Sequence, residues 1–293
     1  ILGHEGVRGI GLYRTELPYM IASDFPDVEM QRDHYAAIYK QLPNRSVIFR
    51  TFDIGGDKKV PYLHIEEEEN PAMGWRATRI GLERPTILRT QFRALIEASA
   101  GRELRFMLPF IAQVSEFDAA KKLFDQEMEQ AKSRGQALPL SVKVGIMIEI
   151  PSILWQLDAI LPKLDFVSIG SNDLMQFLFA CDRSAAHMAD SYDTLSPVML
   201  RVVQLIVDKA AIYQVEVGFC GEMARKPLDA LALLGVGIRN ISVSASALGP
   251  VKSMIRQTNL ESLTEYVQYM METGESSIRH LLAAYAKDHG IPV

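Results

Sequence analysis

The sequence has few cysteines, no long apolar run and no excess of positive charge. Its 293 residues contain only two cysteines, which form neither a CxxC pair nor a zinc-like Cys/His cluster. A disulfide-stapled scaffold is thereby excluded. No apolar stretch reaches the roughly 18 residues that a membrane-spanning helix needs. With 31 basic and 36 acidic side chains the net charge is −5, so neither nucleic acid nor a membrane is the expected partner.

The composition is that of a globular protein. Apolar residues make up 48% of the chain and charged residues 23%, which excludes a disordered polymer. The chain begins at Ile1, with neither an initiator Met nor a signal peptide. We therefore expect a piece of a longer cytoplasmic protein.

Short runs rich in Val, Ile and Phe alternate with amphipathic stretches. The runs predict buried parallel strands at residues 9–13, 46–51, 104–109, 142–150, 166–170, 215–220 and 240–244. Stretches with an apolar period near 3.6 predict helices at residues 116–134, 153–161, 197–213 and 228–234. Strand–helix alternation predicts a parallel sheet with right-handed crossovers.

The expected fold class is α/β, a (β/α)₈ TIM barrel. Such a barrel has eight strands and about 250 residues. Because seven strands are recognised, we expect the first strand to precede Ile1; an open sheet is the alternative. Residues from Val251 onward predict extra helices outside the barrel. No linker or repeat interrupts the chain, so residues 1–293 are expected to form one domain.

Polar side chains cluster just after the predicted strands, where the catalytic loops of a barrel converge. These side chains are Arg14, Glu16, Arg50, Asp53, Lys58, Glu149, Asn172, Asp173, Cys220 and Glu222. Each alone is explained by a helix cap or an ion pair. Their common position on one rim points to a site.

Glu149 and Asp173 lie one βα unit apart, so adjacent strands would bring both carboxylates to one cation. Mg²⁺ is typically bound by one or two carboxylates together with water and substrate oxygens. The alternatives are a buried ion pair for Glu149 and a helix N-cap for Asp173. Spacing alone does not separate these readings.

Arginines near predicted loop starts indicate an anionic ligand. Guanidinium groups bind phosphate and carboxylate bidentately and stay charged. The arginines concerned are Arg14, Arg50, Arg76, Arg79 and Arg183. Cys220, in GFCGE, is either a small buried apolar residue or an acid or nucleophile at the rim.

Eight motifs follow one another along the chain: GIGLYRTE, RTFDIGGDK, ENPAMGWRATRI, GIMIEIPS, SIGSNDLMQF, ACDR, TLSPVML and GFCGEMA. In this order they resemble the phosphoenolpyruvate–protein phosphotransferases, Enzyme I of the bacterial phosphotransferase system. The region is similar to the C-terminal, phosphoenolpyruvate-binding (β/α)₈ domain of that family. MIEIPS and GWRATRI also suit its nitrogen-related branch.

The resemblance implies a role for each matching residue. Glu149 and Asp173 would bind Mg²⁺, and Cys220 would protonate C3 of the enolpyruvate leaving group. The substrate contacts it implies are Arg14, Arg50, Asn172 and Arg183, with Arg76 and Lys58 as further contacts.

The resemblance also implies a reaction and partners. The phosphoryl group of phosphoenolpyruvate would pass to a histidine on a separate N-terminal domain, and from there to a phosphocarrier protein, with release of pyruvate. No motif in this sequence matches the acceptor histidine, so the chain is expected to bind phosphoenolpyruvate without phosphorylating itself. A homodimer in the cytoplasm is expected.

Two other functions, each of a different class, remain as alternatives to phosphoryl transfer. One is a Mg²⁺-dependent C–C lyase or aldolase acting on pyruvate-like substrates, against which the arginines and Cys220 argue. The other is a non-catalytic dimerisation scaffold that senses phosphoenolpyruvate, against which the intact carboxylates and Cys220 argue.

Overall fold

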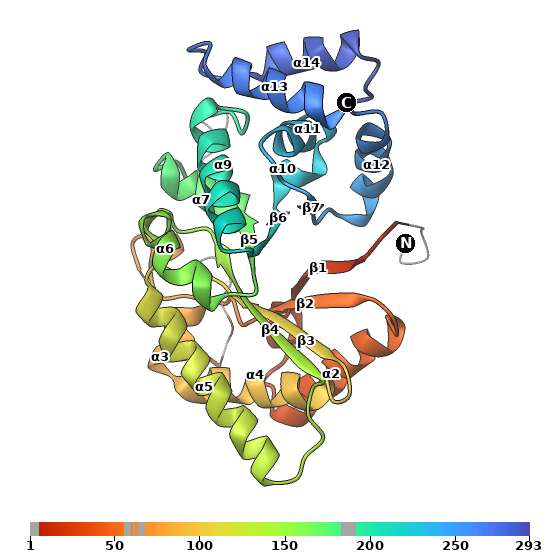
Figure 1. Ribbon diagram of the computed structural model, residues 1–293. Coiled ribbons are helices and arrows are strands. Elements are labelled where there is room, and N and C mark those ends of the chain that lie inside the picture. The colour runs from red at the N-terminus through yellow and green to blue at the C-terminus, as the bar shows by residue number, and fades with distance from the viewer. Residues whose placement is uncertain (1–5, 56–59, 61, 64–67, 183–191) are drawn as a thin grey trace. The chain divides into compact units, whose positions relative to one another are not determined.

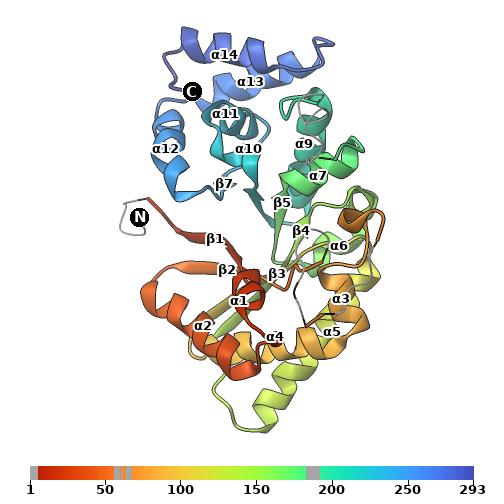
Figure 2. The ribbon, with the colours of Figure 1, turned by 180° about the vertical axis from the view of Figure 1, so that it is seen from behind.

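The computed structural model describes residues 6–55, 60, 62–63, 68–182 and 192–293 (Figures 1 and 2). Lys58 and Arg183, both assigned to the substrate above, lie outside these residues. The chain divides into two compact units, Ile1–Met147 and Ile148–Val293, which we describe one at a time.

The first unit is built on four parallel strands that are neighbours in chain order. They are β1 (Gly9–Arg14), β2 (Ser46–Arg50), β3 (Glu103–Leu108) and β4 (Ser141–Ile148), whose last residue opens the second unit. Their helices are α1 (Glu16–Ile21), α2 (Val28–Gln41), the 3-10 helix η1 (Pro71–Met73), α3 (Thr78–Glu83), α4 (Pro85–Ala98) and α5 (Val114–Ser133). Helix α4 packs against both α2 and α5, as Figures 1 and 2 show.

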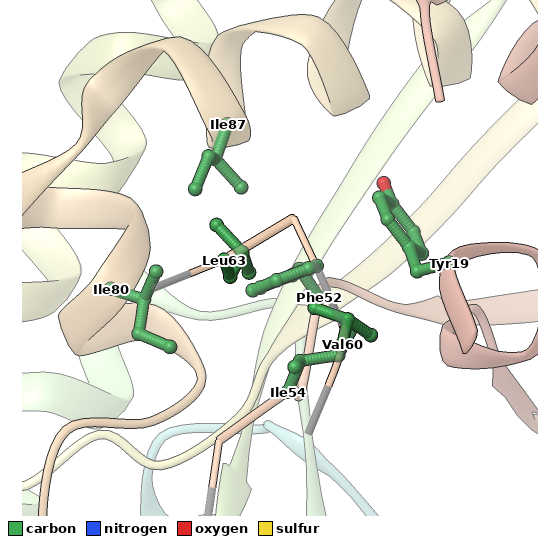
Figure 3. Close-up of a cluster of buried hydrophobic side chains, with 7 residues drawn as sticks. All are labelled: Tyr19, Phe52, Ile54, Val60, Leu63, Ile80 and Ile87. Atoms are coloured by element: carbon green, nitrogen blue, oxygen red, sulfur yellow. The ribbon is translucent and has the colours of Figure 1, made fainter. Parts of the chain in front are cut away.

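A cluster of buried apolar side chains packs beyond the end of β2 (Figure 3). Phe52 and Ile54 follow the strand directly and meet side chains from three helices and the adjoining loop. These side chains are Tyr19, Val60, Leu63, Ile80 and Ile87. The cluster fixes the backbone on both sides of Asp53, the polar residue between Phe52 and Ile54.

The second unit carries the parallel strands β5 (Phe166–Gly170), β6 (Glu216–Cys220) and β7 (Asn240–Ile241). Its helices are η2 (Pro151–Gln156), α6 (Leu157–Ile160), η3 (Leu161–Lys163), α7 (Ser171–Leu178), α9 (Pro197–Ile212), α10 (Glu222–Arg225), α11 (Pro227–Gly235), η4 (Ala245–Ala247), α12 (Leu248–Arg256), α13 (Leu260–Met271) and α14 (Arg279–Asp288). Helices α12, α13 and α14 pack against α11 (Figure 1).

Local sequence explains where several helices begin. The side chain of Asp27 accepts a hydrogen bond from the Met30 N–H at 2.8 Å and caps α2. Ser196 caps α9 in the same way, with Pro197 at the first helical position. These short polar side chains satisfy backbone donors that the first helical turn leaves open.

The predicted fold class is confirmed: parallel strands follow one another in chain order with helices between them, as a (β/α)₈ barrel requires. The helices predicted after Val251 are also present. No helix in the described part of the chain is long and apolar enough to cross a membrane.

Two predicted elements differ from the structure. The single helix expected over residues 153–161 is a short α6 between two 3-10 helices, because Pro151 and Pro162 each lack an N–H. The last strand ends at Ile241 rather than at residue 244, although the Ser242 N–H still donates to the Phe219 carbonyl at 2.9 Å.

Candidate active site

Two arginines meet at one carboxylate in the first unit. Arg50 is the last residue of β2, and its Nη2 lies 2.9 Å from Oδ2 of Asp53. Nη2 of Arg76 donates to Oδ1 of the same carboxylate at 3.0 Å. All three side chains are buried. Asp53 therefore holds two of the predicted substrate arginines next to each other.

Glu16, just after β1, is a second carboxylate in this group. It is buried and accepts a hydrogen bond from Nη2 of Arg50. Nε of Arg14 lies 3.9 Å from the same Glu16 oxygen, and the Arg14 side chain is 60% exposed. Three guanidinium groups face two carboxylates here, so the formal charge of the group is +1, suited to an anion.

The backbone around Gly55 brings Arg76 to Asp53. Gly55 and Arg76 form an isolated antiparallel bridge, and the Ala77 N–H donates to the Ile54 carbonyl at 2.9 Å. Gly55 has a φ of +108°, and a Cβ atom there would lie 2.5 Å from the Trp75 carbonyl oxygen. Only glycine permits this approach.

Arg76 is also fixed from its other side. Its guanidinium carbon lies 4.5 Å from the centre of the Phe110 ring, within cation–π range. With the ring on one side and Asp53 on the other, the guanidinium is held in one orientation.

A network of hydrogen bonds holds the backbone at Arg50 in place. The Thr15 hydroxyl donates to the Arg50 carbonyl at 2.9 Å, and Nε2 of Gln91 donates to that hydroxyl at 3.0 Å. Oε1 of Gln91 accepts the Phe52 N–H at 2.8 Å. Thr15 and Gln91 are fully buried. The network fixes the end of β2.

Two buried polar atoms at this strand end have no hydrogen-bond partner among the described residues. They are Nε of Arg50 and Oγ1 of Thr51. A buried guanidinium N–H without a partner is costly, and an oxygen of an anionic ligand is one acceptor that would satisfy it.

In the second unit, the turn after β6 packs on the start of α7. The Ser171 hydroxyl donates to the Cys220 carbonyl at 3.2 Å, and the Glu222 N–H donates to Oδ1 of Asn172 at 3.0 Å. Because Oδ1 is the acceptor, the amide of Asn172 is oriented with its two N–H groups available as donors.

Gly221 makes this packing possible. Its φ of +116° and ψ of −178° lie in a region that only glycine occupies readily. The backbone thus requires glycine at this position of the GFCGE turn.

Cys220 ends β6 and its side chain is 3% exposed. Its Sγ lies 3.4 Å from the Ser168 hydroxyl and 3.5 Å from the Ile169 carbonyl oxygen. The apolar reading of this cysteine explains its burial, but the thiol also lies among polar groups.

Glu149 and Asp173 are both buried carboxylates of the second unit, and each follows a strand. Glu149 comes directly after β4 and is 2% exposed, whereas Asp173 lies in the first turn of α7 and is 8% exposed. The N-cap position of α7 is Gly170, so the N-cap reading of Asp173 is wrong.

The donor set of these two residues fits Mg²⁺. Carboxylate oxygens are hard ligands, and Mg²⁺ needs only one or two of them. Across the described ranges, no group of three or more His, Cys, Asp or Glu side chains is placed to hold a metal.

Sequence reasoning missed several residues that support the site. Gln91 gives a detectable signal, since it interrupts the apolar face of α4 between Ile87 and Leu95. Ser168 gives another, because it lies two residues before Gly170 in an otherwise apolar strand.

Comparison with known proteins identifies the family of this chain. Residues 2–260 match the model of the family described as PEP-utilising enzyme, PEP-binding domain. A phosphoenolpyruvate-protein phosphotransferase of Bacillus subtilis is 39% identical over 92% of this chain and 48% of that protein. A Salmonella typhimurium protein named phosphoenolpyruvate-dependent phosphotransferase system is 35% identical over 97% of this chain and 38% of that protein.

The chain thus spans about two fifths to one half of the length of these relatives. Among solved structures, a malate synthase from Haloferax volcanii has a TM-score of 0.47 at 12% identity, covering 80% of this chain and 62% of that one. The match over residues 2–260 establishes that the chain belongs to the family of PEP-binding domains of PEP-utilising enzymes.

Proposed function

We propose that this chain binds phosphoenolpyruvate and supplies the groups that transfer its phosphoryl group to a histidine on a separate N-terminal domain, with release of pyruvate. That histidine would pass the phosphoryl group to a phosphocarrier protein. The observation that carries the proposal is Arg50: a buried guanidinium, held by two carboxylates, with an Nε that lacks a partner within the described part of the chain. Family membership names the anion that this group would bind.

The arginines bind the negatively charged oxygens of the substrate. Arg50 and Arg76 are held by Asp53 before any ligand binds, so little conformational entropy is lost on binding. Arg14 is more exposed and adds a third positive charge. During transfer these fixed charges stabilise the charge that develops on the phosphoryl oxygens.

Further contacts rest on the motifs alone. Lys58 and Arg183, outside the described residues, are proposed as additional substrate ligands. Asn172 would donate from its amide N–H groups, because its carbonyl oxygen accepts from Glu222.

Glu149 and Asp173 would hold Mg²⁺. The bound ion would act as a Lewis acid on substrate oxygens. Both carboxylates are buried, and carboxylate oxygens are the hard ligands that this ion prefers.

Cys220 would deliver the proton that completes pyruvate. When the phosphoryl group leaves, the enolate must gain a proton at C3, and a thiol placed beside that carbon can act as the general acid that supplies it. We further propose that residues 1–293 act as one phosphoenolpyruvate-binding domain of a cytoplasmic homodimer.

Calorimetric titration of phosphoenolpyruvate, with and without Mg²⁺, tests the proposal. We expect binding that requires Mg²⁺ and is lost in Glu149→Ala. The matched control is Glu129→Ala, which removes an exposed carboxylate from α5 and should leave binding unchanged. A folded chain that binds phosphoenolpyruvate no more tightly than sulfate would contradict the proposed function.

A further inference from the structure

Ser168 and Cys220 lie on the same face of two paired strands. In the β5–β6 ladder, Ser168 is opposite Gly218 and Gly170 is opposite Cys220. Side chains two residues apart in a strand point the same way, so Ser168 and Cys220 are diagonal neighbours. Gly218 has no side chain between them.

The contacts of the thiol are specific. The Ser168 hydroxyl donates to Sγ of Cys220 at 3.4 Å, and the thiol donates to the Ile169 carbonyl at 3.5 Å. The two hydrogen bonds form a chain in which the hydroxyl donates to the sulfur and the thiol donates to the carbonyl oxygen. Ser168 is 4% exposed and Cys220 is 3% exposed. In a buried environment of low dielectric constant, a hydrogen bond is stronger than in water.

Most buried side-chain hydroxyls donate to the backbone. Ser99 does so here, with its Oγ 2.6 Å from the Leu95 carbonyl oxygen. Ser168 instead donates to the sulfur of the one cysteine that the proposed function makes a proton donor. A hydroxyl needed only to fill space would not require this partner.

We propose that Ser168 is a positioning residue that orients the Cys220 thiol and stabilises the charge it acquires. The inference rests on the proposed function. In the step concerned, the S–H bond breaks and the enolate electron pair forms the new C3–H bond of pyruvate. The sulfur keeps the S–H electron pair as a thiolate, and the Ser168 O–H donates to it. In the reverse direction the thiolate removes a C3 proton from pyruvate.

The S–H stretching band tests the hydrogen bond without any substrate. The band of Cys220 is obtained by subtracting the infrared spectrum of Cys220→Ala from that of the unaltered chain. A donor to sulfur cooperatively strengthens the hydrogen bond from the thiol to the Ile169 carbonyl, which lowers the S–H stretching wavenumber. Ser168→Ala weakens that hydrogen bond and should move the band to higher wavenumber. Ser168→Thr keeps a hydroxyl and should leave the band in place. An unmoved band in Ser168→Ala would overturn the proposal.

Exchange of pyruvate methyl protons in D₂O, followed by NMR with Mg²⁺ and inorganic phosphate present, tests the role in proton transfer. We expect Cys220→Ala to abolish exchange and Ser168→Ala to slow its maximal rate at least about tenfold, with pyruvate affinity unchanged. Ser168→Thr should restore the rate. The control is Ser99→Ala, which deletes a buried hydroxyl that has no link to Cys220.

The outcomes separate the two proposals. No exchange by the folded, unaltered chain, or full exchange by Cys220→Ala, contradicts the role of Cys220 in the proposed function, and the infrared band then decides whether Ser168 binds the thiol. Normal exchange by Ser168→Ala, with Cys220→Ala inactive, overturns the role of Ser168 alone. If Ser168→Ala fails to fold by circular dichroism, Ser168→Gly provides the second deletion of the hydroxyl.

Discussion

A Cβ atom on Gly221 would lie 2.1 Å from the hydroxyl oxygen of Ser171. It would also lie 3.0 Å from Oδ1 of Asn172. The turn after β6 and the first turn of α7 thus touch where only a hydrogen atom fits. This close approach allows two hydrogen bonds between the turn and the helix. The Ser171 hydroxyl donates to the Cys220 carbonyl, and the Glu222 N–H donates to Oδ1 of Asn172.

Gly221→Ala should therefore damage the site beyond its effect on stability. The positive φ and the clash together should lower the free energy of unfolding by about 1–3 kcal/mol, measured by urea denaturation. Phosphoenolpyruvate binding should weaken as well, because Asn172 is displaced. Gly101→Ala is the control: φ is +72° there, but nothing lies within 4 Å of the added Cβ. Equal binding by the two variants would refute this reading of the contact.

Asp53→Asn should separate the two arginines that now share a carboxylate. Without that charge, two buried guanidinium groups repel each other, and breaking a buried pair costs about 3–5 kcal/mol of unfolding free energy. Phosphoenolpyruvate should bind at least about tenfold more weakly, which is about 1.4 kcal/mol. Calorimetry and urea denaturation measure both effects.

The control for Asp53→Asn is Asp158→Asn, which breaks an ion pair with Lys209 on the surface. Exposed pairs contribute little, so neither stability nor binding should change appreciably. If Asp53→Asn binds phosphoenolpyruvate as the unaltered chain does, Asp53 does not position the arginines for this ligand.

Most of the strands were predictable because buried parallel strands appear in a sequence as continuous apolar runs. The bounds predicted for β5 are those observed, and β2 differs by one residue. The helix expected over residues 153–161 was wrong because the apolar period persists through a region where prolines favour 3-10 turns.

The residues of the candidate site were predictable only where the residue type itself indicates a chemical role. Arg50 and Glu149 stand out because charge follows an apolar run. That Asp53 joins Arg50 to Arg76 was not predictable, because the bridge at Gly55 is a tertiary contact with no periodic signal. The hydroxyl of Ser168 was missed for a similar reason: its partner is on another strand.

Gln91→Leu should destabilise the first unit although the two side chains are similar in volume. The leucine cannot accept the Phe52 N–H or donate to Thr15, so buried polar groups lose their partners. Leaving such a group unsatisfied costs about 1–3 kcal/mol of unfolding free energy. Urea denaturation measures this, and Gln126→Leu at an exposed position of α5 is the control that should show little change. A Gln91→Leu chain as stable as the original would show that the network is dispensable.

The ionic cluster of Arg279 should make the stability of the chain depend on acid pH. Arg279 lies 2.6 Å from Asp193 and 2.8 Å from the fully buried Asp229. Burial disfavours ionisation of Asp193, but hydrogen bonds from Arg279, the Leu195 N–H and Ser277 outweigh it, so the pKa of Asp193 lies well below its ordinary value.

Because the folded state lowers this pKa, the stabilisation is complete above the unfolded pKa of about 3.9 and is lost as the pH falls below it. Arg279→Ala should lower the free energy of unfolding by about 2 kcal/mol at pH 7, less than a fully buried pair because Arg279 is partly exposed. The difference from the unaltered chain should shrink at pH 3, because Asp193 of the unfolded chain is protonated there while Asp193 of the folded chain still resists protonation. Urea denaturation across this range checks the prediction, with Lys121→Ala, which breaks an exposed pair with Asp125, as the control. A difference that stays constant with pH would mean that Arg279 stabilises the fold by packing and not by its charge.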